Sequence, residues 1–109
     1  MENDFEIIWT DLALEELAET VEYLERKFTE KEVDNLGDEI ERILAIISAN
    51  PHIFPTSSKN QIRKAVILKF NSMYYRIAGN NIQILSFFFF FFKLQSRFLY
   101  LYMKTKLLC

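Results

Sequence analysis

The apolar residues of this 109-residue chain change their spacing part-way along it, and this change limits the fold more than any other feature. Between Ala13 and Ile47 they recur every three or four residues, which places them on one face of a helix. From Gln61 onward the period falls to two, which is typical of strands with one covered face. The length suits one domain with its own core. We therefore expect a single α+β domain.

Two helices are predicted in the first half. Thr10 and Asp11 offer N-cap oxygens for the first helix. Thr29-Glu-Lys-Glu32 has the form of a capping box for the second, which should end by Asn50 because Pro51 disfavours helix at the preceding residue. Helices joined this tightly form an antiparallel hairpin. The expected apolar faces are Ala13, Leu17, Val21, Leu24 and Phe28, then Val33, Leu36, Ile40, Ile43, Leu44 and Ile47. The intervening glutamates, Glu15, Glu16, Glu19, Glu22 and Glu25, are predicted to form a solvated face.

Four strands are predicted around this hairpin. They are Phe5–Trp9, Gln61–Phe70, Met73–Ile77 and Ile82–Phe87, with a loop at 51–60 and turns at 71–72 and 78–81. In the second strand Ile62, Val66, Leu68 and Phe70 share one parity and are expected on one face. The first strand must pair with the later ones, because alone it cannot bury its face. The predicted fold is β–αα–βββ, with the helical hairpin packed on a small, mainly antiparallel sheet.

Charge is strongly divided along the chain. Residues 1–41 contain all fifteen Asp and Glu side chains and three Lys or Arg, a net of −12. Residues 42–109 contain ten Lys or Arg and no carboxylate side chain, a net of +10. A basic half of this kind favours a polyanion or an acidic protein as partner.

Several classes of protein are excluded by composition. Two glycines in total exclude a phosphate-binding glycine loop. The lone histidine, His52, and the lone cysteine, Cys109, exclude a multi-ligand zinc site and an internal disulfide. We expect no metal or other cofactor. The apolar tract from Ile84 to Met103 carries Lys93 and Arg97 in its middle, which argues against a membrane span. The acidic N-terminal residues indicate no export, so a cytoplasmic location is expected.

The candidate site is a group of basic and phenolic side chains on the predicted strand hairpin: Arg63, Lys64, Lys69, Tyr74, Tyr75 and Arg76. Arg63 and Lys69 share a parity, and the next strand is expected to bring Arg76 close to them. Guanidinium and ammonium groups beside phenols suit phosphate contact and base stacking. An edge strand protected by charge, which also docks an acidic partner helix, produces the same pattern. Both interpretations stay open.

The order and spacing of several short segments resemble RelE/ParE toxins of bacterial type II toxin–antitoxin modules, most closely ParE-like members. The resemblance covers about residues 5–87. The segments are Ile8-Trp-Thr-x-x-Ala13, Leu17, Tyr23-Leu24, Asn50-Pro-x-Ile-Phe-Pro55, Ile62-Arg-Lys-Ala-Val66, Tyr74-Tyr-Arg-Ile77 and Ile82-x-Ile-Leu85.

The resemblance implies a β–αα–βββ toxin that a small cognate antitoxin wraps and neutralises. ParE-like members are associated with poisoning DNA gyrase, which would make this chain a non-enzymatic inhibitor. RelE-like members instead cut messenger RNA on the ribosome. Arg63 matches the family's arginine on the second strand. For a nuclease, Arg63, Lys69 and Arg76 would supply charge stabilisation and Tyr75 a proton-transfer group. A third alternative is an inactive remnant that only binds antitoxin.

After Ser86 the chain departs from the family pattern, which typically continues as Phe-Asp-x-Arg-Gln-[Asp/Asn]-Pro. Six phenylalanines, Phe87 to Phe92, follow instead. Because phenylalanine codons are T-rich, such a run implies a nucleotide tract that is prone to slippage. We assign residues 1–87 to the toxin-like domain and interpret the atypical apolar tail, 88–109, as a frameshift product. The structural alternative is an extended last strand that a helix at Leu94–Met103 covers.

Overall fold

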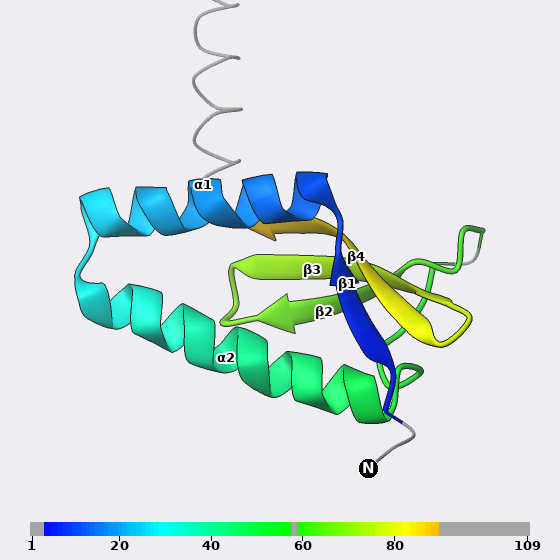
Figure 1. Cartoon of the computed structure of the whole chain (residues 1–109). Helices are drawn as coiled ribbons and strands as arrows, with labels where there is room; N and C mark the ends of the chain where they lie inside the picture. The colour runs from blue at the N-terminus through cyan, green and yellow to red at the C-terminus, as the bar shows by residue number, and fades with distance from the viewer. Residues whose placement is uncertain (1–3, 58, 90–109) are drawn as a thin grey trace, which may run out of the picture.

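The computed structural model describes residues 4–57 and 59–89, which form two helices and a four-stranded sheet (Figure 1). The order β–αα–βββ and the α+β class are confirmed. The elements are β1 (Glu6–Trp9), α1 (Asp11–Lys27), α2 (Glu30–Ala49), β2 (Arg63–Ile67), β3 (Asn71–Ala78) and β4 (Asn81–Phe89).

The helix boundaries follow the predicted caps. Thr10 Oγ1 accepts a hydrogen bond from the Ala13 amide at 3.2 Å and donates to the Ile84 carbonyl at 2.8 Å, so one hydroxyl both caps α1 and ties it to β4. The predicted capping box of α2 is present, with the Thr29 amide donating to the Glu32 carboxylate at 3.0 Å. Hydrogen bonds from the Thr29 hydroxyl and, secondly, from the Thr29 amide hold the pKa of Glu32 below its usual range.

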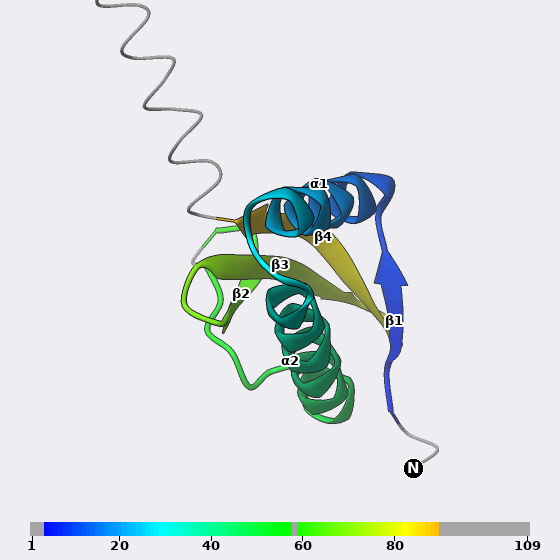
Figure 2. The same ribbon diagram turned by 90° about the vertical axis from the view of Figure 1, so that its left-hand side faces the viewer.

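The strands lie in the order β1-β4-β3-β2, so the first strand pairs with the last, as expected. β1 runs parallel to β4, and the other two pairs are antiparallel. Figure 2 shows α1 lying along β4, with β1 at one edge of the sheet. The register of β3 with β4 shifts once: Tyr74 pairs with Ser86 and Tyr75 with Ile84, which leaves Leu85 as an extra residue.

One glutamate of α1 holds this irregular part of β4. Glu16 Oε1 accepts hydrogen bonds from the Ser86 hydroxyl at 2.7 Å and from the Phe87 amide at 2.9 Å. Glu16 is half-buried, so the prediction that it belongs to the solvated face is wrong. β1 ends at Trp9, opposite Ile84, so beyond that point β4 has no strand partner on this side among the described residues, and its Phe87 amide is satisfied by the Glu16 side chain instead.

The core lies between the helices and one face of the sheet. Buried side chains come from alternate positions of β2, β3 and β4 and from both helices. Ala13, Leu24, Leu36, Ile40, Ile43 and Ile47 of the predicted faces are buried, whereas Leu17, Val21, Val33 and Leu44 are partly buried. Tyr23 of α1 is buried but was not predicted. Phe28, predicted to be core, is 49% exposed. α1 ends at Lys27, and Phe28 has extended backbone angles, so its side chain leaves the apolar helix face and contacts Tyr23 edge-on.

β2 differs most from expectation. It is shorter than predicted, and it buries Ala65 and Ile67, whereas Val66, on the apolar parity of the predicted strand, is 51% exposed. The turn falls at 68–70, where Leu68 and Lys69 have positive φ angles of 51° and 70°. Because successive side chains of a strand point to opposite faces, burial of Ala65 and Ile67 puts Val66 on the exposed face of β2.

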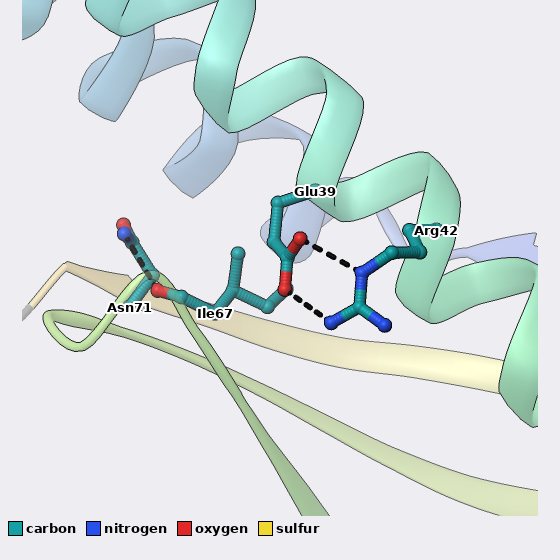
Figure 3. Close-up of polar contacts among 4 residues, drawn as sticks. All are labelled: Glu39, Arg42, Ile67 and Asn71. Carbon is teal, nitrogen blue, oxygen red and sulfur yellow. Dashed lines mark hydrogen bonds and ion pairs between the residues drawn. The ribbon is translucent and has the colours of Figure 1, made fainter.

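The residues predicted to form that turn, Asn71 and Ser72, belong to β3 instead. Asn71 Nδ2 donates a hydrogen bond to the Ile67 carbonyl at 3.0 Å across the turn (Figure 3). This buried amide therefore stabilises the turn from the position where the strand begins.

The phenylalanine run begins inside the sheet. Phe87 is fully buried and Phe89 is 7% exposed, whereas Phe88 between them is half-buried, so these three alternate as a strand requires. Residues 90–109, with the predicted helix at 94–103 and most of the predicted frameshift product, lie outside the described residues. In the described part, neither helix has the length and apolar character needed to cross a membrane.

Candidate functional site

The six predicted site residues do not form one cluster. Strand pairing sets Arg63 opposite Tyr75 and Lys64 opposite Tyr74. Lys69 lies in the turn at the far end of the hairpin, beyond the end of β2. At about 3.3 Å per residue, the last residue of β2, Ile67, is already roughly 13 Å along the strand from Arg63. The expectation that Lys69 would lie beside Arg63 and Arg76 is therefore wrong, because β2 ends before it.

Arg63 and Arg76 both line a pocket, together with described residues from the segment between α2 and β2 and from the end of β3. This cationic pocket has a volume of about 590 Å³. Its lining is His52, Lys59, Asn60, Gln61, Arg63, Arg76, Ile77 and Ala78. His52, which falls in the predicted loop 51–60, thus belongs to the site. Lys59, Asn60 and Gln61 also line it and were not among the predicted site residues. The only sequence signal for them was their position just before the basic strand.

Arg63 holds the loop in place. Its Nη1 donates hydrogen bonds to the carbonyl oxygen of Phe54 at 2.6 Å and to that of His52 at 3.4 Å. Loop backbone also pairs with the start of β2, since the Lys64 amide donates to the Pro55 carbonyl at 3.4 Å. The loop therefore reaches the pocket as part of the sheet edge.

Arg76 is exposed and is oriented by a neutral partner. Its Nε donates to Gln83 Oε1 on β4 at 2.9 Å. Arg63 is likewise bonded to backbone carbonyls, and among the described residues no carboxylate lines the pocket. The two guanidinium groups are thus positioned by neutral oxygens that leave their charges uncompensated.

Tyr75 points to the opposite side of β3 from Arg76. It is fully buried, and its hydroxyl donates to the Pro51 carbonyl at 2.8 Å. Burial raises the pKa of this phenol, more than the nearby Arg63 charge and a backbone hydrogen bond lower it. The predicted role of Tyr75 in proton transfer does not fit this position, because the hydroxyl is enclosed and already bonded to the Pro51 carbonyl.

Replacing Tyr75 by phenylalanine is expected to lower the free energy of unfolding at pH 7 by about 1–2 kcal/mol, because the Pro51 carbonyl loses its donor. The variant should also be less sensitive to alkali. In the wild type the unfolded phenol ionises near pH 10 while the folded phenol stays neutral, so the unfolded state binds fewer protons and stability falls as pH rises through and above 10. Urea unfolding between pH 7 and 11 measures both effects.

Tyr74→Phe is the matched control, since its half-buried phenol lies on the other face of β3. It should change the unfolding midpoint little and keep the alkaline slope of the wild type. An identical alkaline slope in Tyr75→Phe and wild type would contradict the predicted linkage.

No protein-family profile matches the sequence, and no curated protein matches it. Among solved structures, a chain titled "Chromosomal ParDE TA system from P. aeruginosa" is similar, with a TM-score of 0.66 and 18% sequence identity. The alignment covers 79% of this chain and 96% of that one. The fold is that of a ParDE toxin–antitoxin chain. The structural likeness therefore agrees with the resemblance that the sequence segments carry.

Within this ParDE-type fold, the described residues contain no group of three or more His, Cys, Asp or Glu side chains that could hold a metal ion. The chemistry that the candidate site offers is cationic: guanidinium and ammonium groups, amides and one imidazole around the cationic pocket. Such groups bind anions and stabilise negative charge.

Proposed function

We propose that this chain is the toxin component of a type II toxin–antitoxin module, ParE-like, which inhibits a protein target such as DNA gyrase in the cytoplasm. A cognate antitoxin neutralises it, and no cofactor takes part. The observation that carries the proposal is the likeness to the ParDE-system chain over 96% of that chain's length. The order of the sequence segments in residues 5–87 supports it independently.

The partner-binding surface is assigned to the basic hairpin. Lys64 and Tyr74 are cross-strand neighbours and, with Arg76, alternate with buried residues, which places them on the sheet face opposite the helices. This face offers positive charge beside a phenol to an acidic partner surface. Arg63 contributes at the rim of the cationic pocket. Lys69 forms a separate contact point with exposed Leu68 and Phe70 at the turn.

One observation favours the second candidate, a RelE-like ribosome-dependent endoribonuclease. Arg63 and Arg76 face one pocket with Lys59, an arrangement suited to stabilising charge on a phosphodiester in its transition state. The enclosed hydroxyl of Tyr75 weighs against it, because the proton-transfer group of that candidate is removed from the pocket.

The test uses the purified full chain in two parallel assays. We expect gyrase-dependent DNA breaks and loss of supercoiling, without cleavage of messenger RNA on ribosomes. Lys64→Ala combined with Tyr74→Ala should weaken gyrase inhibition at least about tenfold if these side chains form part of the binding surface. Arg42→Ala is the control, because this arginine is on α2 and pairs with Glu39 at 2.7 Å (Figure 3).

Two results would overturn the proposal. Ribosome-dependent RNA cleavage that Arg63→Ala abolishes would establish the nuclease instead. An inactive chain that only binds antitoxin would fail both assays and would not arrest growth on expression. It would still bind the cognate antitoxin and so titrate it in cells.

A further inference from the structure

We infer that the cationic pocket is a binding site for a small phosphate-bearing molecule, with a pyrophosphate group as the recognised chemistry. The inference does not depend on the proposed function, because it rests on the pocket alone. It assigns Lys59, Arg63 and Arg76 as anion-binding residues and Gln83 as a positioning residue.

The cationic pocket carries more positive charge than a singly charged anion would neutralise. Lys59, Arg63 and Arg76 carry three positive charges at neutral pH, and the part of the chain that the structure describes contributes no acidic side chain to the lining. Like charges held at one pocket repel each other, and a bound anion relieves this repulsion. A ligand with two or three negative charges fits best, and guanidinium groups match phosphate oxygens geometrically.

Both arginines are held ready for a ligand. Arg63 is anchored through Nη1 to the Phe54 carbonyl at 2.6 Å, and Arg76 through Nε to Gln83 at 2.9 Å. A guanidinium has five N–H donors, so each arginine can keep its anchor and bind an anion at the same time. Arg42 differs, because the Glu39 carboxylate accepts from two of its nitrogens and neutralises it.

The dimensions and the remaining lining favour a small molecule. A volume of about 590 Å³ lies within the range of about 300–1,000 Å³ that is typical of small-molecule sites. The amides of Asn60 and Gln61 and the apolar Ile77 and Ala78 are placed to contact the part of the ligand beyond the phosphates. Gln61 has a positive φ of 57°, and strained residues of this kind concentrate where loops bind ligands.

Isothermal titration of the full chain with sodium pyrophosphate at low salt tests the inference. We expect one molecule bound per chain. Arg76→Ala should weaken binding at least about tenfold, since hydrogen bonds between charged groups are lost. Gln83→Leu should weaken it about threefold by releasing Arg76 from its anchor. Arg42→Ala removes the same charge away from the pocket and should leave the affinity unchanged.

The unfolding midpoint in urea shows whether each variant is folded, and Arg76 is exposed, so its replacement should not alter the fold. Absence of pyrophosphate binding would overturn the inference, as would equal losses in Arg76→Ala and Arg42→Ala. Citrate binding as tight as pyrophosphate would show that any polyanion suffices and would also overturn it.

The source of the phosphate is tested by competition. Displacement of pyrophosphate by ADP at comparable affinity supports a free nucleotide as ligand. Displacement by single-stranded RNA or DNA at much lower concentration than ADP would assign the pocket to nucleic acid and overturn the small-molecule inference. Gyrase inhibition is not measured in any of these titrations. The phosphate site can therefore be disproved while the proposed function stands, and the proposed function can be disproved while the phosphate site stands.

Discussion

Replacing Phe87 by alanine is expected to lower the free energy of unfolding by about 3–5 kcal/mol, the usual cost of removing a buried aromatic side chain. Phe87 is fully buried on β4, opposite Met73 of β3, in the face of the sheet that the helices cover. Its loss leaves a cavity among side chains that belong to the packed core. Urea unfolding of wild type and variant, followed by circular dichroism, measures the difference.

Phe88→Ala is the control within the same run. Phe88 is half-buried and pairs with Ser72, on the other parity of β4. Its replacement should cost about 1 kcal/mol or less. Equal losses in the two variants would show that the alternation of Phe87 and Phe88 is wrong, and with it the register of β4.

Replacing Glu16 by alanine is expected to lower the free energy of unfolding by about 2–3 kcal/mol. The carboxylate accepts two hydrogen bonds, from Ser86 Oγ and the Phe87 amide, and the variant leaves that amide without its side-chain acceptor. Because Glu16 joins α1 to the irregular part of β4, the loss should also increase hydrogen exchange at the Phe87 amide. Chemical denaturation and amide exchange measure the two effects.

Glu15→Ala is the matched control, because it removes an exposed carboxylate from the adjacent helix position. Its effect should be within about 0.5 kcal/mol of zero. A double-mutant cycle with Ser86→Ala isolates the Glu16–Ser86 bond, and a coupling near zero would contradict the role assigned to Glu16.

The helical half of the fold could be predicted closely. The caps at Thr10 and Thr29 and the residue before Pro51 specify where each helix begins and ends through local hydrogen bonds and local steric conflict. The apolar period then identifies the buried face. The prediction that Phe28 is buried was wrong because Phe28 is the C-cap of α1 and its backbone leaves the helix, so the helical period no longer applies to it.

The strand hairpin could be predicted only in outline. Asn71-Ser72 carries stronger turn preferences than Leu68-Lys69, but the turn lies at the latter pair, with positive φ angles that these residues rarely adopt. Placing the turn there buries Ala65, Ile67 and Met73 against α2 and β4, and this packing outweighs the local preference.

The candidate site shows the same division. The basic residues of the hairpin are evident in the sequence, but their grouping depends on where the turn falls and on how loop 51–62 returns to the sheet. Lys69 moves to the far end of the hairpin, Tyr75 turns into the core, and His52 and Lys59 join Arg63 and Arg76 at the cationic pocket. A loop has no hydrophobic period, so its sequence gives no pattern that predicts which of its residues lie beside the strands.

The sequence by itself determined the element order, the helix ends and the separation of acidic and basic halves. It also determined that the first strand pairs with the later strands. These features depend on local chemistry and on periodicity along the chain. Tertiary structure alone decided which face of β2 is buried, the recruitment of Glu16 to β4 and the formation of the cationic pocket. Each of these joins residues distant in sequence, and the free energy that selects them comes from burial and hydrogen bonds made only when the elements pack together.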